Sequence, residues 1–405
     1  MRFLFVHSNY PAQFRHIIRR LAADPRHQVR FISQHVEWHA EPIPGVERFT
    51  YHLGRPAHQQ GHPYLERLES AVLHGQAVAR VAEGLKRQGW VPDLMVGHSG
   101  FGATLYLKDV YPQVPFVGYF EWYYNSHGSD VEFIRPQGVP LQTAMQTRSF
   151  NATTLMDLAV AQAGLTPTRW QWQQFPELFR PQLTVIHDGI DSGYFAPAPQ
   201  RPRAIPGLNL DLAAMPEIVT YATRGMEPYR GFPQFMAALS ILQQQRPQLQ
   251  AIIVGADQVF YGNPRPDGRS WRQACLQDYP LDPARIHFTG PLSYPAYRTV
   301  LQASDCHCYL TYPFVLSWSL LEAMSCGCAI VASATAPVQE LIEDGVQGRL
   351  VDFYSPDALA GMVGHLLDHP DRRQQLGRQA RARIQAEYEQ EPLLVQQLNW
   401  LKNQT

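Results

Sequence analysis

The chain has 405 residues, of which 45% are hydrophobic and 17% are charged. At about 150 residues per domain, this length predicts two or three domains with full hydrophobic cores. The 35 acidic and 34 basic residues give a net charge of -1, which argues against a general nucleic-acid-binding protein because such proteins carry a basic excess. No run approaches the ~20 apolar residues of a membrane span. Five cysteines in so long a chain favour a reducing, cytoplasmic location over a disulfide framework.

In the first half of the chain, short apolar segments alternate with longer helical patterns. The short segments are rich in β-branched and aromatic residues, which is typical of strands. We expect strands at residues 2–6, 29–33, 94–96 and 116–119, and helices at residues 13–22 and 71–87.

The alternation restarts near residue 184, and a Pro-rich spacer follows at residues 196–202. We expect strands at residues 184–186, 218–222, 251–254, 286–288, 306–310 and 329–332, helices at 232–244 and 318–326, and a helical stretch at 371–402. Strands that alternate with helices predict parallel sheets covered on both faces. Such sheets bind ligands at the carboxyl ends of their strands, so the functional residues are sought there.

Residues 317–333 place one carboxylate among apolar side chains. Ser317 opens the expected helix and Gly327 closes it. Glu322 follows Leu320 and Leu321, and burying a carboxylate unpaired costs several kcal/mol, roughly. Glu322 therefore needs a strong hydrogen-bond donor, and two remain open: the hydroxyls of a ligand such as ribose, or an arginine in a structural ion pair.

Residues 223–232 place two arginines around a Gly/Pro turn, between a predicted strand and a predicted helix. Arg224 and Arg230 carry permanent charge and several donors each, and a helix N-terminus attracts anions. The arrangement suits a diphosphate. Two solvated loop arginines are the alternative.

Together these stretches resemble the nucleotide-binding domain of the family 4 retaining glycosyltransferases, which have the GT-B fold. The resemblance implies that Arg224 and Arg230 hold the donor diphosphate, with Arg230 where the family usually has Lys. It also implies that Glu322 binds the ribose, as the second Glu of the family's Glu-x7-Glu signature. Residues 327–333 match the continuation of that motif, and residues 185–191 match the family's turn at the domain junction.

The chain departs from the family at the first Glu of this signature, because that position is Phe314. The family's usual contact with the donor sugar is therefore missing. Backbone N–H groups at the start of the following helix can hold the sugar and its phosphate without a particular side chain. The predicted donor site accordingly includes Gly225, Phe314, Val315, Leu316, Ser317 and Trp318.

The first half is expected to bind the acceptor, beginning with the loop that follows the first strand. Asn9 and Gln13 can hydrogen-bond sugar hydroxyls, and Tyr10 can stack on a sugar face. An ordinary strand-to-helix turn is the alternative.

Two further residues follow predicted strands of the first half. His98 matches the last His of a family strand, and Glu121 falls where the family has a sugar-contacting His. A carboxylate there can accept hydrogen bonds from donor hydroxyls or guide the acceptor proton. An aromatic core strand with one paired Glu is the alternative.

The predicted fold class is α/β, as a GT-B protein with two doubly wound, Rossmann-like domains facing across a cleft. Residues 1–187 form the predicted acceptor-binding domain and residues 188–382 the nucleotide-sugar-binding domain. Residues 383–405 are expected as a C-terminal helix that packs back on the first domain.

The predicted function is transfer of a hexose from a UDP- or GDP-sugar to an acceptor hydroxyl with retention of configuration. The acceptor is a saccharide, a lipid-linked molecule or a small molecule. The two arginines replace a metal clamp, so neither a metal ion nor a cofactor is expected. We expect a cytoplasmic protein without a nucleic-acid partner, and leave open peripheral contact with the inner membrane face and the oligomeric state.

Two other functions remain open. One is a different GT-B activity, such as a nucleotide-sugar epimerase. The other is a catalytically degenerate partner subunit that binds nucleotide sugar, which Phe314 favours. The retained Arg224, Arg230 and Glu322 favour the enzyme, because buried charges without a ligand are costly.

Overall fold

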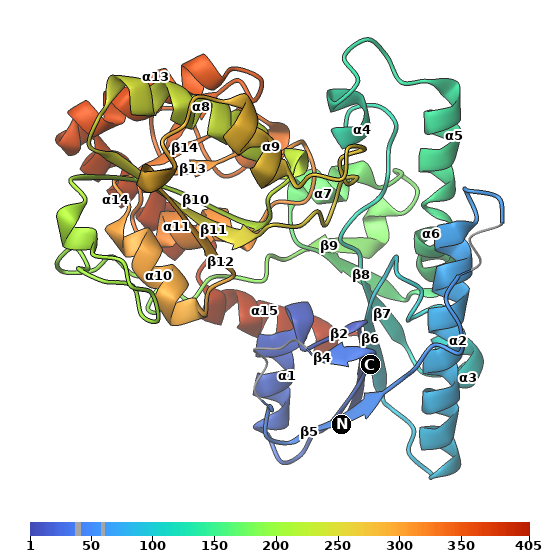
Figure 1. Cartoon of the computed structure of the whole chain (residues 1–405). Coiled ribbons are helices and arrows are strands. Elements are labelled where there is room, and N and C mark those ends of the chain that lie inside the picture. The colour runs from blue at the N-terminus through green and yellow to red at the C-terminus, as the bar shows by residue number, and fades with distance from the viewer. Residues whose placement is uncertain (37–41, 58–60) are drawn as a thin grey trace. The chain divides into compact units, whose positions relative to one another are not determined.

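A computed structural model describes residues 1–36, 42–57 and 61–405 of the chain (Figure 1). The described chain divides into two compact units. Unit 1 consists of Met1–Asp188 together with Glu391–Thr405, and unit 2 consists of Gly189–Gln390.

Unit 1 is built on a parallel sheet in which seven strands pair in the order β5-β3-β1-β6-β7-β8-β9. In that order the strands are Val46–Thr50, Gln28–Ser33, Arg2–Val6, Leu94–His98, Phe116–Tyr119, Ala163–Thr166 and Leu183–Val185. Two short strands, β2 (Asn9–Tyr10) and β4 (His35–Val36), pair separately. The helices are α1 (Arg15–Ala22), α2 (Glu66–Arg87), α3 (Leu107–Val110), α4 (Asp130–Phe133), α5 (Leu141–Ser149), α6 (Ala152–Val160), α7 (Arg169–Gln174) and α15 (Gln390–Lys402).

The first strand shows why this sheet is covered on both faces. Successive strand residues point to opposite sides, and all of Phe3–Val6 is buried. Phe3 and Phe5 join one core, which α1 and α15 cover, whereas Leu4 and Val6 join another, which α2 covers. A strand that is apolar at every position is typical of a parallel sheet between two helix layers.

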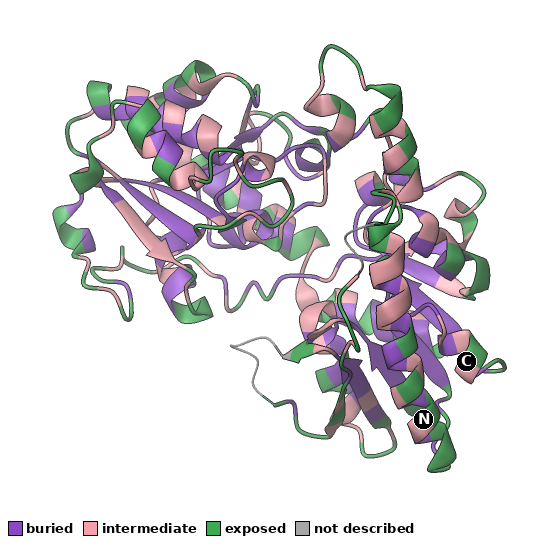
Figure 2. Ribbon diagram, turned by 45° about the vertical axis from the view of Figure 1, so that its right-hand side comes forward, coloured by how far each residue is buried: buried purple, intermediate pink, exposed green. Residues whose placement is uncertain are grey.

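Unit 2 contains a parallel sheet of six strands in the order β12-β11-β10-β13-β14-β15. The strands are Ile286–Gly290, Leu249–Ala256, Glu217–Gly225, Cys306–Tyr309, Ile330–Ser333 and Arg349–Val351. On one face lie α8 (Phe232–Gln245), α9 (Trp271–Asp278) and α13 (Pro356–Asp368), and on the other α10 (Tyr294–Ala303), α11 (Trp318–Ser325) and α14 (Pro370–Glu387) (Figure 1). The short α12 is Ala336–Gln339. The central strands of both sheets are buried (Figure 2).

These two parallel-sheet α/β units confirm the predicted fold class. In both sheets the strand order reverses once, between β1 and β6 in unit 1 and between β10 and β13 in unit 2. At such a reversal the connections leave toward opposite faces of the sheet and a crevice opens at the carboxyl ends of the strands. The fold therefore predicts one binding site in each unit, at the carboxyl ends of the strands where the strand order reverses.

The C-terminal stretch, which was expected to be helical over residues 371–402, forms two helices. The first, α14, runs to Glu387 and buries Ile384 in the core of unit 2. The chain then pairs Glu389 with Ile190, and α15 packs into the core of unit 1 through Leu394, Leu398 and Leu401. Residue 383, where the returning helix was expected to begin, thus lies inside α14.

Among the described residues no helix is long and apolar enough to cross a membrane.

Candidate functional site

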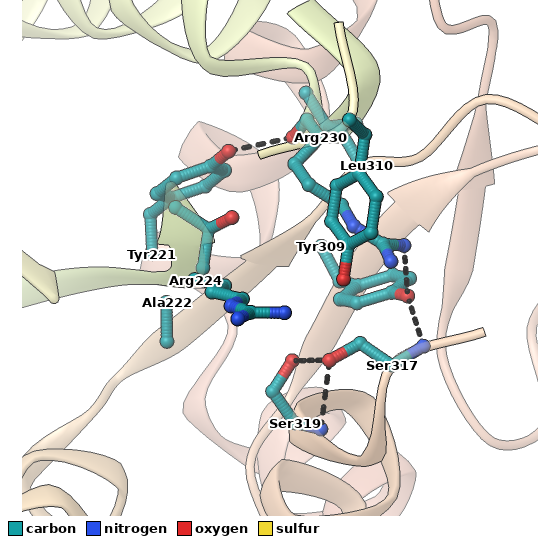
Figure 3. Close-up of a pocket in the computed structure, with 10 residues that line it drawn as sticks. Tyr221, Ala222, Arg224, Arg230, Tyr309, Leu310, Ser317 and Ser319 are labelled. Carbon is teal, nitrogen blue, oxygen red and sulfur yellow. Dashed lines mark hydrogen bonds between the residues drawn. The ribbon is translucent and has the colours of Figure 1, made fainter. Parts of the chain in front are cut away.

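A pocket lies at the point in unit 2 where the strand order reverses (Figure 3). The ends of β10 and β13, the start of α11 and the loop after β11 supply its walls. Its lining residues are Tyr221, Ala222, Thr223, Arg224, Arg230, Tyr261, Tyr309, Leu310, Ser317 and Ser319. The structure therefore brings both predicted arginines and Ser317 to one place.

Arg230 is anchored from behind by the protein. Its side chain is buried, and Nη1 donates to the Thr311 hydroxyl and to the Val315 carbonyl, both at 2.9 Å, and to the Tyr309 hydroxyl at 3.4 Å. All three acceptors are neutral, so no carboxylate cancels the charge of Arg230 there. The site keeps a buried positive charge facing an open pocket.

Arg224 is held only loosely. Within the described parts of the chain its guanidinium makes no hydrogen bond or ion pair, and it lies over the Phe260 ring at 4.4 Å from the centroid. Figure 3 shows the guanidinium groups of Arg224 and Arg230 pointing toward the space that Ser317 and Ser319 border. An anion in that space would meet two cations.

The start of α11 closes the lower side of this space. Ser317 is the N-cap residue, and its hydroxyl accepts from the Ser319 N–H at 3.3 Å. The Ser317 N–H itself donates to the Tyr309 hydroxyl at 3.0 Å, so it is already engaged. Leu316 is buried, and Trp318 is partly exposed and does not line the pocket. Of the predicted cradle at 315–318, Ser317 is therefore the residue that borders the pocket, while Val315 contributes its carbonyl to Arg230.

Glu322 lies on α11 one turn beyond Ser319 and is buried. It does not line the pocket surface. Burial raises the pKa of its carboxyl from 4.5 to about 7, because a desolvated carboxylate loses favourable hydration. No arginine within the described residues forms an ion pair with it, which removes the structural ion pair proposed as an alternative.

Phe314 belongs to a group of aromatic rings rather than to a polar site. Its ring meets those of Tyr229 and Tyr261 edge-on, each at 5.5 Å between centroids. Tyr229 in turn lies 4.8 Å from Tyr312. At the position where the family has a carboxylate, this chain therefore presents an aromatic ring within a group of aromatic side chains.

In unit 1 the switch between β1 and β6 brings together His7, His98, Glu121 and Gln13. His7 and His98 follow or end these two strands, and their rings lie 4.9 Å apart. Nε2 of His98 is 3.5 Å from Oε2 of Glu121, and Nε2 of Gln13 donates to Oε1 of Glu121 at 3.4 Å. Three predicted residues thus form one polar cluster at the carboxyl edge of the sheet.

A buried network behind His98 sets the direction of its ring. Nδ1 of His98 lies 2.9 Å from the Ser99 carbonyl, which can only accept, so Nδ1 carries the proton and Nε2 faces Glu121. The Ser99 hydroxyl donates to Asp157 at 2.7 Å, as does Thr104. Burial raises the pKa of Asp157 to about 6. Sequence reasoning missed Asp157, which lies 58 residues from Ser99 in the chain.

Of the other two predicted acceptor residues, Asn9 adjoins this cluster and Tyr10 points into the core. The backbone N–H of Asn9 donates to Nδ1 of His7 at 2.8 Å. Tyr10 is fully buried against Phe31 in the core of unit 1. The expectation that Tyr10 stacks on a sugar is therefore wrong, because an aromatic side chain at this point packs into the core of unit 1 between the sheet and α1.

Tyr261, which lines the pocket, and its neighbour Phe260 were not predicted from the sequence. They lie in the loop between β11 and α9, which carries no recognised motif. The position of this loop after the carboxyl end of β11, next to β10, is the signal that could have identified them.

Among the described residues, no three His, Cys, Asp or Glu side chains lie together in a way that could hold a metal ion.

Two glycosyltransferase family models match the chain, one in each half. A family model described as the glycosyl transferase family 4 group matches residues 25–195, and one described as glycosyl transferases group 1 matches residues 210–383.

Curated relatives match about half of the chain. D-inositol 3-phosphate glycosyltransferase of Mycobacterium leprae is 31% identical over 204 residues, which cover 50% of this chain and 43% of that protein. The protein of the same name from Salinispora tropica is 27% identical over 205 residues, or 49% of this chain and 42% of that one. The match thus spans less than half the length of these relatives.

Solved structures match over the whole length. Sucrose-phosphate synthase from Thermosynechococcus elongatus has a TM-score of 0.72 at 18% identity and covers 100% of this chain and 98% of its own. HepE of Anabaena, solved in complex with UDP-glucose, has a TM-score of 0.70 at 18% identity and covers 100% of both chains. At such identities the likeness concerns the fold, which is GT-B.

Proposed function

Because the chain belongs to the family 4 group of glycosyltransferases and has the GT-B fold, we propose that it transfers a sugar from a nucleoside-diphosphate sugar to an acceptor hydroxyl. The observation that carries this proposal is the pair Arg224 and Arg230 at the strand-order reversal of unit 2, where both guanidinium groups face one pocket.

The two arginines would act on the leaving group. As the bond from the anomeric carbon to the diphosphate breaks, negative charge grows on the β-phosphate. Fixed cations aimed at that charge lower the barrier, and this electrostatic contribution is usually a major one. Arg230 is suited to the role because its three hydrogen bonds to neutral acceptors hold it in place before the ligand arrives. The N-terminus of α11 adds a partial positive charge at the same pocket.

Glu322 is proposed to bind the ribose. In its ionised form it would accept hydrogen bonds from the two ribose hydroxyls, and so position the anomeric carbon. Its pKa of about 7 means that donor binding and deprotonation are linked, since the hydroxyl donors favour the charged form.

The cluster at the carboxyl edge of the unit 1 sheet is proposed to bind the acceptor, with Glu121 as the group that accepts or guides the proton of its hydroxyl. Gln13 donates to the Glu121 carboxylate and so orients it, and the His98 ring lies beside it. We further propose retention of the anomeric configuration and a reaction without a metal ion, because two arginines offer the diphosphate the charge that a metal would otherwise supply.

UDP-sugars are the donors to test first. HepE of Anabaena and TarM of Staphylococcus aureus have both been solved with UDP, and the proposal extends this ligand to the present chain. The names of the curated relatives include D-inositol 3-phosphate, and we therefore propose to test that molecule in the first acceptor panel next to simple saccharides.

The test is a panel of UDP-, GDP-, ADP- and CMP-sugars, with chelator present, measured for binding and for slow donor hydrolysis. One donor that binds and is hydrolysed supports the transferase and names its sugar. Binding without turnover, also after the acceptor panel is added, would instead favour the partner subunit that only binds nucleotide sugar. The absence of binding to any donor would overturn the proposal.

A further inference from the structure

A carboxylate that sequence reasoning did not single out holds one wall of the donor pocket. Glu227 lies between the two arginines in the sequence, at the turn before α8, and is 0% exposed. Its Oε1 accepts from the Phe260 N–H at 3.0 Å, and its Oε2 accepts from the Tyr261 N–H at 3.0 Å and from the Gly262 N–H at 2.8 Å. Three successive backbone N–H groups thus converge on one carboxylate.

This arrangement determines where the loop lies. No described cation forms an ion pair with Glu227, so backbone N–H groups alone replace the water that the buried carboxylate has lost. Moving the loop would leave the charge unsatisfied, which is costly. Gly225 supports the same close approach, because a Cβ there would lie 2.5 Å from the Gln258 carbonyl oxygen and from the Phe260 ring.

The loop held in this way carries the rings on which both pocket arginines rest. The Arg230 guanidinium lies 5.0 Å from the centroid of Tyr261, and that of Arg224 lies 4.4 Å from the centroid of Phe260. Tyr261 also lines the pocket and is 36% exposed. The Phe314 ring supports Tyr261 edge-on, so Tyr261 is fixed between that ring and the Arg230 side chain.

We propose that Tyr261 contacts the diphosphate part of the bound donor, and that Glu227 is the positioning residue that holds Tyr261 in the pocket. This inference rests on the proposed function and deepens it. The phenol hydroxyl of Tyr261 can donate a hydrogen bond to a phosphate oxygen beside the Arg230 guanidinium. Glu227 touches no ligand and acts through the backbone of residues 260–262.

The test measures the dissociation constants of UDP and of uridine for the full chain by titration calorimetry, with GDP and guanosine in parallel. The variants are Tyr261→Ala, Glu227→Gln and the double variant. The matched control is Asp267→Asn, which removes a carboxylate of the same loop that forms surface ion pairs with Arg265 and Arg269.

For Tyr261→Ala we expect diphosphate binding about tenfold weaker or more, as for the loss of a hydrogen bond to a charged group. For Glu227→Gln we expect a loss of similar size, because the amide NH₂ would face a backbone N–H and release the loop. The double variant should bind no more weakly than the weaker single one, since Glu227 acts through Tyr261. Uridine binding should stay within twofold in every variant, and the control should match the wild type.

Three outcomes would overturn the inference. They are unchanged UDP binding in Tyr261→Ala, additive losses in the double variant, and an equal loss of uridine binding, which would indicate general damage to the domain. If Glu227→Gln fails to fold, Gly225→Ala replaces it, because the added methyl group displaces the same loop while the carboxylate remains. A wild-type chain that binds neither UDP nor GDP would instead refute the proposed function, so the two failures are distinguishable.

Discussion

Removing the Arg224 side chain should weaken donor binding with little effect on folding. The guanidinium of Arg224 has no hydrogen bond or ion pair among the described residues, and its contact is with the Phe260 ring at 4.4 Å. Such an exposed cation–π contact contributes about 0.5–1 kcal/mol. A charge-assisted hydrogen bond to a phosphate contributes about 1.5–3 kcal/mol. In Arg224→Ala we therefore expect nucleoside-diphosphate binding to weaken roughly 10- to 150-fold.

The matched control for this variant is Arg272→Ala. The guanidinium of Arg272 also rests on an aromatic ring, that of Phe288 at 4.0 Å, but Arg272 does not line the pocket. Both variants should lose a similar, small amount of stability in thermal unfolding. Titration calorimetry with UDP and GDP, at low and at moderate salt, should then separate them. The reasoning is refuted if Arg224→Ala binds the diphosphate as tightly as Arg272→Ala does.

Three further predictions concern single groups. In the wild type, Glu322 keeps its proton in the folded state up to about pH 7 but loses it near pH 4.5 when unfolded. The stabilisation that the protonated side chain contributes to the folded state, about 3 kcal/mol, is therefore present below pH 4.5 and lost as the pH rises through 7. Glu322→Gln should remove this pH dependence. Urea unfolding of the wild type and the variant at pH 5 and pH 8 checks it. If the difference in free energy of unfolding between the two proteins is the same at both pH values, the prediction is wrong. Glu121→Gln should lower kcat for transfer about 10²- to 10⁴-fold while calorimetry shows unchanged UDP binding; a loss in binding alone would place Glu121 in the donor site. Transfer measured after exhaustive EDTA treatment should keep its full rate, and a rate restored only by added Mg²⁺ or Mn²⁺ would contradict the proposed role of the two arginines.

Most strands of the two sheets could be predicted because they depend on the pattern of apolar and polar residues close together in the chain. Strands β1 and β11 are apolar at nearly every position, and this pattern is typical of a strand buried on both faces. Strands β5, β8 and β15 were not predicted from the sequence. β8 is buried between β7 and β9 but has only four residues, whereas β5 and β15 lie at the sheet edges and are largely exposed or half-buried. An edge strand has fewer buried positions, so its sequence carries a weaker signal.

The pocket of unit 2 was predictable as far as its residues lie within short sequence motifs. Arg224 and Arg230 are six residues apart: Arg224 is the second-to-last residue of β10, and Arg230 ends the turn before α8. Tyr261 was not predicted as a pocket residue, because its position depends on the buried carboxylate of Glu227, 34 residues away in the chain. A carboxylate in a Gly/Pro turn looks solvated in the sequence, and its burial follows only when the loop folds over it.

The sequence by itself determined the alternation of strands and helices, the family resemblance and the two cationic residues of the pocket, because each rests on residues close together in the chain. The tertiary structure alone decided which groups face one another. It placed His98 beside Glu121 and linked Asp157 to Ser99, and it sent Tyr10 into the core. These outcomes depend on contacts between residues far apart in the chain, and such contacts exist only once the sheet of unit 1 has formed and its helices have packed.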